Sequence, residues 1–221
     1  MKCFFLDFFL FIKNPSYEKR IKTYPILFYP FLLFLLNFFI FISIEKLKNI
    51  LDISLSLKHN LLNDFFKDNI YLMGFIVGPV YEEFLFRAIL KPNKIGVSLF
   101  VFAFSYLFLK IAHLGFNLNI VLSLIIGILI YISNIKINTV FYNKNYRSLI
   151  YFSSILFGLV HLTNFNLTFS ILLLSPILML PRIFTGFSLA FIRVKFGLVY
   201  AILFHSLFNA FLTLYSIYIN K

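Results

Sequence analysis

Long apolar runs separated by short clusters of charged residues make up most of the chain. A helix needs about 20 apolar residues to cross a bilayer, and residues 25–44 supply such a run without a charge. Residues 50–68 mix apolar and charged positions, which favours an amphipathic segment at the membrane surface. Further spans are predicted at 69–91, 96–112, 118–135, 149–163, 167–181, 183–194 and 196–219. The pattern predicts an all-α protein, a polytopic transmembrane helix bundle of about eight helical segments.

The same pattern divides the chain into three consecutive parts, with no linker or repeat between them. Residues 1–24 are expected to form a basic cytoplasmic segment, 25–68 the first span and the interfacial segment, and 69–219 the main helical core. Pro176 and Pro181 are expected to break the region in which they lie, because proline lacks a backbone donor and clashes with the preceding turn.

Composition identifies the surrounding solvent as lipid. Hydrophobic residues make up 61% of the chain and charged residues only 13%, and the mean hydropathy is +0.93. A water-soluble domain carries about a quarter charged residues. We therefore expect a multi-pass integral protein of a bacterial cytoplasmic (inner) membrane, with the lipid bilayer as its first partner. Cys3 is the only cysteine, which excludes an internal disulfide.

The net charge of +12 does not indicate a nucleic-acid partner. The basic residues lie mostly in the predicted loops, as expected for orientation by the positive-inside rule and for contact with anionic headgroups. No nucleic-acid-binding module lies between them. Counting basic residues in alternate loops favours a cytoplasmic amino terminus, with Arg182 in an inside loop and Arg193 and Lys195 in an outside one.

Two adjacent acids, Glu82 and Glu83, lie inside an apolar span, and no Asp or Glu follows them in the chain. An unpaired charge at such a position costs at least a few kcal/mol. Arg87 is four residues after Glu83 and therefore on the same helix face, which predicts a structural ion pair. Glu82 points about 100° further round the helix and has no local partner. Glu82 is therefore the functional candidate.

The helix before these acids contains Gly74, Gly78 and Pro79. The two glycines form a small-xxx-small pair, which favours the close approach of another helix. Pro79 has no backbone N–H, so in a regular α-helix it leaves the carbonyl of Phe75 without a partner and kinks the helix about one turn before the glutamates.

Polar groups recur at helical spacing in two later apolar segments. Phe157 and His161 are four residues apart, and so are His205 and Asn209, so each pair lies on one helix face. A single buried histidine or asparagine is more often a packing residue with a satisfied hydrogen bond. An unpaired glutamate in the same bundle shifts the balance towards a shared polar site.

These residues resemble the CPBP superfamily of intramembrane proteases, which includes the CAAX prenyl endopeptidases and the Abi type. Residues 82–87 match its EExxxR motif, residues 157–161 its FxxxH motif and residues 205–209 its HxxxN motif, in that order. The resemblance covers roughly residues 70–210, so that 69–219 is identified as a CPBP-type protease core. The amino-terminal third has no signature of the family and is a candidate for specifying the substrate.

The resemblance implies a catalytic set of Glu82, Glu83, His161, His205 and Asn209. In this set Glu82 takes a proton from water, and Arg87 holds Glu83. The resemblance also implies that His161 orients the water, and that His205 and Asn209 stabilise the oxyanion, while Phe157 is a supporting residue. A rival mechanism places a zinc ion on Glu82, His161 and His205, a chemically reasonable His₂Glu set. We favour the mechanism without a metal, because an asparagine is a poor zinc ligand and a good oxyanion donor.

The expected function is an intramembrane endopeptidase that hydrolyses membrane-associated peptides, including prenylated, otherwise lipidated or toxin-like ones. The chain contains neither two intramembrane aspartates nor the His-Glu-x-x-His motif, which argues against two other classes of intramembrane protease. Two alternatives stay open. One is a non-catalytic immunity or scaffold protein of the same fold, and the other is a transporter that couples protons through Glu82.

Overall fold

The computed structural model describes residues 2–15, 28–50, 70–91, 93–111, 115–133, 139–165 and 168–219. These residues are almost entirely helical, which confirms the all-α class. The interfacial segment predicted at 50–68 lies, apart from Ile50, outside the described residues. The elements are α1 (Lys2–Lys13), α2 (Phe28–Ile50), α4 (Ile70–Leu72), a π-helix (Met73–Val77), α5 (Gly78–Phe86), a 3-10 turn (Ala88–Leu90), α6 (Lys94–Ile111), α7 (Phe116–Ile132), α8 (Thr139–Val160), a 3-10 turn (His161–Asn164), α9 (Phe169–Leu178), α10 (Leu180–Lys195) and α11 (Leu198–Ile219).

Three stretches within the described residues are long and apolar enough to cross a membrane: Pro30–Leu47, Ile171–Lys195 and Leu198–Tyr215. The second of these includes both α9 and α10, which are separated by Met179 alone. The break expected near Pro176 and Pro181 therefore falls between the two prolines. Arg182 lies in the first turn of α10 instead of the predicted inside loop.

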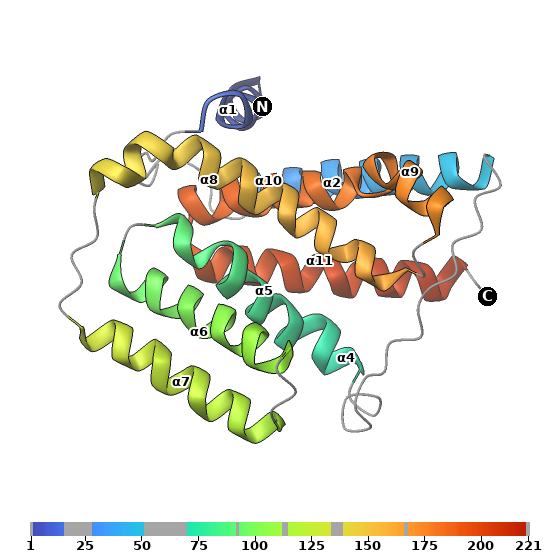
Figure 1. Ribbon diagram of the computed structural model, residues 1–221. Coiled ribbons are helices and arrows are strands. Elements are labelled where there is room, and N and C mark those ends of the chain that lie inside the picture. The colour runs from blue at the N-terminus through green and yellow to red at the C-terminus, as the bar shows by residue number, and fades with distance from the viewer. Residues whose placement is uncertain are drawn as a thin grey trace.

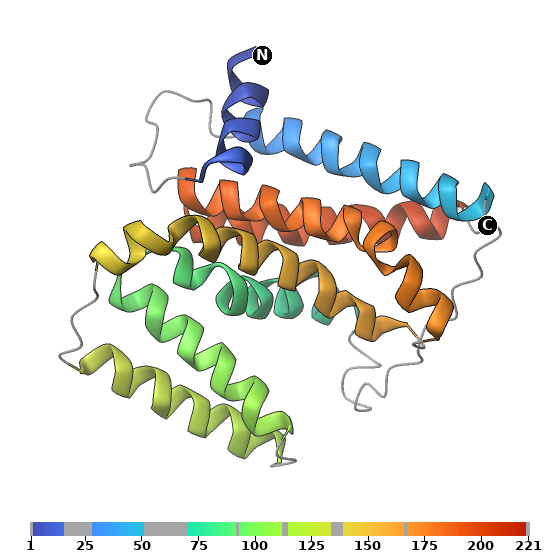
Figure 2. The same cartoon turned by 45° about the horizontal axis from the view of Figure 1, so that its top comes forward.

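Helix α10 lies at the centre of the bundle. It packs against α8, α11 and α2, and α1 also contacts it. Figure 1 and Figure 2 show α2 and the α6–α7 pair at opposite sides, with α8, α10, α11 and α5 between them. The crossing of α8 and α10 is very close, because a Cβ atom on Gly186 would lie 2.6 Å from the carbonyl oxygen of Ser154. Only a glycine fits at this crossing.

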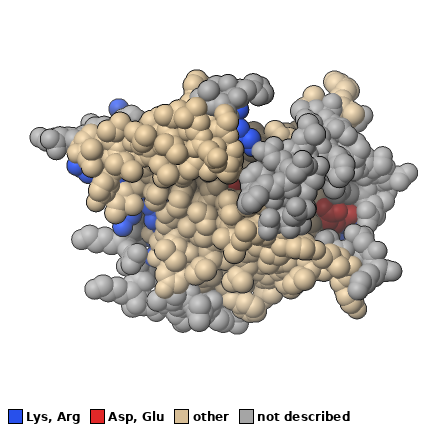
Figure 3. Space-filling model, turned by 90° about the horizontal axis from the view of Figure 1, so that it is seen from below, with Lys and Arg blue, Asp and Glu red and all other residues tan. Residues whose placement is uncertain are grey.

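The α6–α7 pair carries an apolar outer surface. Figure 3 shows the face seen from below, where most of the drawn described residues are uncharged, with small patches of Lys and Arg and an acidic patch toward the right. The most exposed apolar side chains of α7 are Val121, Ile128, Leu129 and Ile132. Such a surface is stable when acyl chains replace water as its surroundings. The molecule is an integral membrane protein on this evidence and on its spans.

Helix α1 is a feature that the hydropathy pattern did not predict within residues 1–24. Its buried Phe8 and Phe11 both pack edge-to-face against Phe191 of α10, with ring centroids 5.4 Å and 5.3 Å apart. Such aromatic pairs contribute about 0.5–1.5 kcal/mol each beyond the burial of their area. The start of the chain is thus fixed to the central helix.

The carboxyl end of α10 corrects the assignment of two basic residues to an outside loop. Arg193 and Lys195 lie in its last turn and are each only 8% exposed. Gly197 follows with a φ of 117°, a conformation that favours glycine, and its N–H donates to the Ile192 carbonyl at 3.1 Å. This turn sends α11 back along α10, and it thereby positions His205.

Candidate active site

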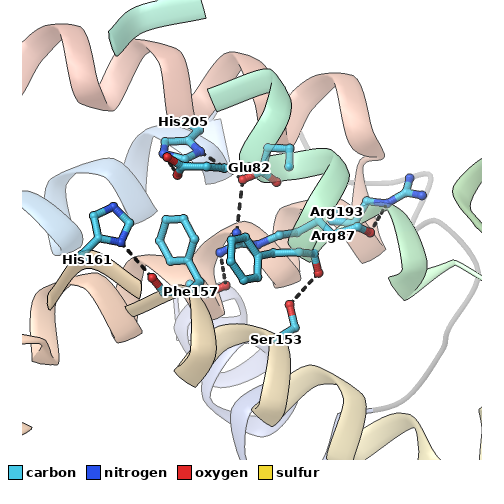
Figure 4. A network of polar contacts seen from close by, with 10 residues as sticks. Glu82, Arg87, Ser153, Phe157, His161, Arg193 and His205 are labelled. Carbon is cyan, nitrogen blue, oxygen red and sulfur yellow. Dashed lines mark hydrogen bonds and ion pairs between the residues drawn. The ribbon is translucent and has the colours of Figure 1, made fainter. Parts of the chain in front are cut away.

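Three helices contribute the residues singled out by the sequence. Glu82 and Glu83 lie on α5, Phe157 lies on α8 with His161 directly after its end, and His205 lies on α11. Figure 4 shows Glu82, His161 and His205 gathered between the helices, with the Phe157 ring between the two histidines and the arginines beyond it. The three motifs therefore meet in one region of the bundle.

Glu83 is the centre of a buried ionic group. Its side chain has no exposed surface, and its Oε1 lies 3.0 Å from His205 Nδ1 and 3.6 Å from Arg87 Nη1. The ion pair expected from the spacing of Glu83 and Arg87 is present. The contact with His205 was not expected, because the resemblance placed that imidazole on the substrate carbonyl. A carboxylate at Nδ1 favours the tautomer that carries its proton there.

Glu82 differs from its neighbour in its access to the surroundings. Its side chain is 31% exposed, while its Oε2 lies 3.6 Å from His205 Nε2. That oxygen is buried and has no hydrogen-bond partner among the described residues. The His205 ring thus lies between the two carboxyl groups, with Glu83 on one nitrogen and Glu82 facing the other.

Arg87 is fully buried and held on several sides. Its guanidinium carbon lies 3.9 Å from the centroid of the Phe157 ring, and its Nη2 donates to the Gly186 carbonyl at 3.4 Å. A planar guanidinium can stack face to face on an aromatic ring and at the same time present its N–H groups to a carboxylate. An ammonium group has no flat face with which to do both. Arg87 therefore joins α5, α8 and α10 around Glu83.

His161 lies at the point where α8 ends and a 3-10 turn begins. Its Nδ1 is 2.8 Å from the Phe157 carbonyl, and its ring packs on the Phe157 ring with centroids 4.9 Å apart. The His205 ring packs on the same phenyl group at 5.5 Å. Because a carbonyl only accepts, Nδ1 carries the proton in this bond and Nε2 is the acceptor nitrogen.

Asn209 binds backbone in this structure. Its Nδ2 donates to the Gly74 carbonyl at 3.1 Å. The π-helix explains why that carbonyl is available: Gly78 N–H bonds to the Met73 carbonyl, and the next residue, Pro79, has no N–H to offer Gly74. In the regular α-helix assumed from the sequence, Pro79 lies opposite the carbonyl of Phe75. In the π register found here Pro79 lies opposite the carbonyl of Gly74 instead.

The space around Gly74 also differs from the expectation. Among the described residues, a Cβ atom at Gly74 would meet nothing within 4 Å, so no described helix packs tightly against that side of the glycine. The close approach predicted for the Gly74–Gly78 pair is found instead at the α8–α10 crossing. Gly78 serves the π turn itself, because a Cβ there would lie 2.8 Å from the Met73 carbonyl oxygen.

Two supporting residues were not identified from the sequence. Arg193 donates from Nε to the Arg87 carbonyl at 3.0 Å and from Nη2 to the Ala88 carbonyl at 3.3 Å. Ser153 Oγ donates to the Phe86 carbonyl at 2.6 Å. These carbonyls end α5, where a helix leaves its last acceptors unsatisfied. A buried helix end requires such donors, but no local pattern shows which distant residues supply them.

The rival zinc site would need Glu82, His161 and His205 to converge on one point. The described residues include no group of three or more His, Cys, Asp or Glu side chains placed to hold a metal ion. A His₂Glu zinc site needs all three donors within about 2.2 Å of one point. His161 and His205 instead pack on the same phenyl ring, and both nitrogens of His205 face carboxyl groups. As arranged here, the residues do not fit the metal.

Comparison with known families gives a match over most of the helical core. The matching model is that of the Rce1-like family of type II CAAX prenyl endopeptidases, and it covers residues 69–211. That range contains all the candidate site residues and leaves α1 and α2 outside it. No curated protein and no solved structure matches the chain.

Proposed function

The chain belongs to the Rce1-like family of type II CAAX prenyl endopeptidases, and from that premise we propose that Glu82 is its general base. The family implies a CAAX-type intramembrane endopeptidase. The proposed substrates are prenylated, otherwise lipidated or toxin-like peptides that reach the site from the bilayer. The proposed location is a bacterial cytoplasmic membrane, with the amino terminus inside.

The observation that carries the proposal is the different setting of two adjacent carboxyl groups. Glu83 has no exposed surface and is taken up by Arg87 and His205, whereas 31% of the Glu82 side chain is exposed. A general base must reach the water it deprotonates, and only Glu82 meets this condition. Glu83 and Arg87 then serve as the support that fixes α5 and the His205 ring.

In the proposed reaction Glu82 removes a proton from a water molecule as the water oxygen bonds to the scissile carbonyl carbon. The carbon–nitrogen bond then breaks, and the proton held by Glu82 passes to the leaving amine. The Nε2 of His161, left as an acceptor by the Phe157 carbonyl, orients that water. His205 lies beside Glu82 and keeps the orientation that Glu83 gives it.

Asn209 has the role of an oxyanion donor in this proposal. One amide N–H bonds to Gly74 and holds the carboxamide in place, and a carboxamide has a second N–H for the substrate. Asn209 lies on the same face of α11 as His205, four residues on. Removal of one positioned oxyanion donor typically costs about 3–4 kcal/mol of transition-state stabilisation.

The test is turnover of a farnesylated CAAX peptide by the purified protein in lipid nanodiscs. Glu82→Gln should lower the rate by roughly 10²–10⁴-fold, the usual contribution of a general base, and leave the protein folded. Asp7→Asn, which neutralises an acid on α1 outside the family match, is the matched control and should keep the wild-type rate. A normal rate for Glu82→Gln would remove Glu82 from the role of base.

If the wild-type protein cleaves none of the prenylated, acylated and unmodified peptides, the hypothesis of a non-catalytic scaffold is favoured. The transporter hypothesis makes a separate prediction. It requires a Glu82-dependent proton flux across sealed liposomes in the absence of any peptide cleavage.

A further inference from the structure

A cavity of about 110 Å³ lies beside His161 and has one wall outside the family match. That wall is formed by α2, and the rest comes from the turn at His161 and the α9–α10 junction. The lining residues that matter for its chemistry are Phe41, Ile44, Glu45, His161, Met179 and Arg182. The volume suits roughly one amino-acid side chain of moderate size.

The α2 wall is held in place by buried hydrogen bonds. Asn37 Nδ2 donates to Ser188 Oγ at 2.9 Å, and Thr185 Oγ1 donates to Asn37 Oδ1 at 2.9 Å. Phe41 follows Asn37 by four residues, and so it lies on the same face of α2 one turn further on. The cavity is therefore a built feature of the bundle, since the Asn37 carboxamide bonds to α10 through both its nitrogen and its oxygen.

Arg182 is the cation of this cavity. Its charge interacts with Glu82, with Glu45 and with His161, so it lies within electrostatic range of the proposed catalytic group. Within the described part of the chain, however, no hydrogen bond or ion pair to its guanidinium is found. This contrasts with Arg87, which is stacked and hydrogen-bonded. A guanidinium has five donors and matches a carboxylate in bidentate geometry.

We propose, on the basis of the function proposed above, that Arg182 binds the free carboxylate at the carboxyl terminus of the peptide substrate. The cavity then takes the terminal side chain against Phe41, Ile44 and Met179. Because the cavity shares His161 with the proposed site, a carboxylate held there fixes the distance from the chain end to the cleaved bond. In a C-a-a-X sequence three residues follow the cysteine, and when extended they span roughly 10 Å. The carboxylate subsite would therefore lie about that far from the bond after the cysteine.

A peptide carboxylate is favoured over a lipid phosphate by the composition of the cavity. The apolar residues around Arg182 suit a side chain such as Leu or Met, whereas they would leave the polar oxygens of a glycerophosphate headgroup without partners. Glu45 lies in the same lining and competes with the ligand for Arg182. Substrate recognition thus involves α2, the part of the chain that the family model does not include.

The experiment measures binding of a fluorescent farnesylated CAAX peptide by anisotropy, with a free acid or an amide at its end. The protein is the Glu82→Gln variant in zwitterionic nanodiscs, which prevents turnover. We expect the acid to bind about tenfold or more tightly, as for a charge-assisted hydrogen bond. Arg182→Gln should bring the two affinities together, and Arg182→Lys should restore part of the difference. Arg147→Gln, at an exposed arginine on α8, is the matched control and should retain it.

Glu45→Gln should act in the opposite direction and widen the difference between acid and amide, because it removes the competing carboxylate. Equal binding of acid and amide overturns the inference, even when the peptide is cleaved normally and the proposed function stands. So does an acid preference that anionic lipid abolishes, since Arg182 would then bind headgroups. If the peptide acid binds more tightly than the amide in an Arg182-dependent way but the wild type cleaves no peptide, the carboxylate subsite stands and the proposed protease function is refuted.

Discussion

The same small change should destabilise the protein much more at Glu83 than at the adjacent Glu82. Glu83→Gln replaces a fully buried carboxylate that contacts both Arg87 and His205, and it leaves the Arg87 guanidinium buried without its counter-charge. Breaking a buried pair by removing one partner costs about 3–5 kcal/mol. Glu82→Gln changes a side chain that is 31% exposed and whose buried oxygen has no hydrogen bond among the described residues. It should cost about 1 kcal/mol or less.

The measurement is thermal unfolding of the purified variants in one detergent, followed by far-UV circular dichroism, because the chain has no tryptophan. At about 2–4 °C per kcal/mol for a chain of this length, the apparent midpoint should fall by roughly 6–20 °C for Glu83→Gln. It should stay within a few degrees for Glu82→Gln. All scans use one heating rate, since unfolding of such proteins is often irreversible.

A double variant separates the buried charge from other causes. In the Glu83→Gln background, Arg87→Met removes the uncompensated guanidinium and should recover part of the lost midpoint, because apolar replacement of a buried ion pair is often near neutral. Equal midpoints for the two single variants would refute the reasoning. So would a double variant whose loss of midpoint relative to the wild type equals the sum of the two single losses.

Three further outcomes are expected. Arg87→Lys should lower both the unfolding midpoint and the turnover rate, because Lys cannot reproduce the ring stacking and the carboxylate clamp together; circular dichroism and peptide cleavage check this. Asn209→Ala removes the exposed hydrogen bond to the Gly74 carbonyl and should lower the unfolding free energy by about 0.5–1.5 kcal/mol, read as a fall in midpoint in the same scans. Elemental analysis should find less than stoichiometric zinc, with activity retained after exhaustive chelation. Stoichiometric zinc, with activity lost to chelator and restored by zinc alone, would make His161 and His205 ligands.

Hydropathy predicted the apolar helices closely where the whole element is apolar. The spans expected at 96–112, 118–135 and 196–219 match α6, α7 and α11 within a few residues. It failed where a helix is polar along part of its length. Helix α8 begins at Thr139, ten residues before the predicted span, because its first turns carry Asn, Lys and Arg. Helix α1 was missed because it is short and lies in a segment treated as basic.

Local spacing predicted the Glu83–Arg87 contact, since the two residues are one helical turn apart. It could not predict that His205 binds Glu83, because that contact joins positions 122 residues apart and depends on the turn at Gly197. The same limit applies to Arg193. Its charge suggested a loop position, but it donates to the carbonyls of Arg87 and Ala88 at the end of α5. Basic residues within a bundle are assigned correctly only when the acceptors around them are known.

The position of Asn209 depends on a one-residue difference in helix register. An α-helical Pro79 would leave the Phe75 carbonyl without a donor, but the π turn from Met73 to Val77 transfers that vacancy to Gly74. Asn209 supplies the missing donor from α11, which ties the amino-terminal side of α5 to the helix that carries His205. The carboxamide is thereby fixed by the backbone before any substrate arrives. An oxyanion donor is effective only when it is oriented in advance, and here Pro79 and the π turn together account for that orientation.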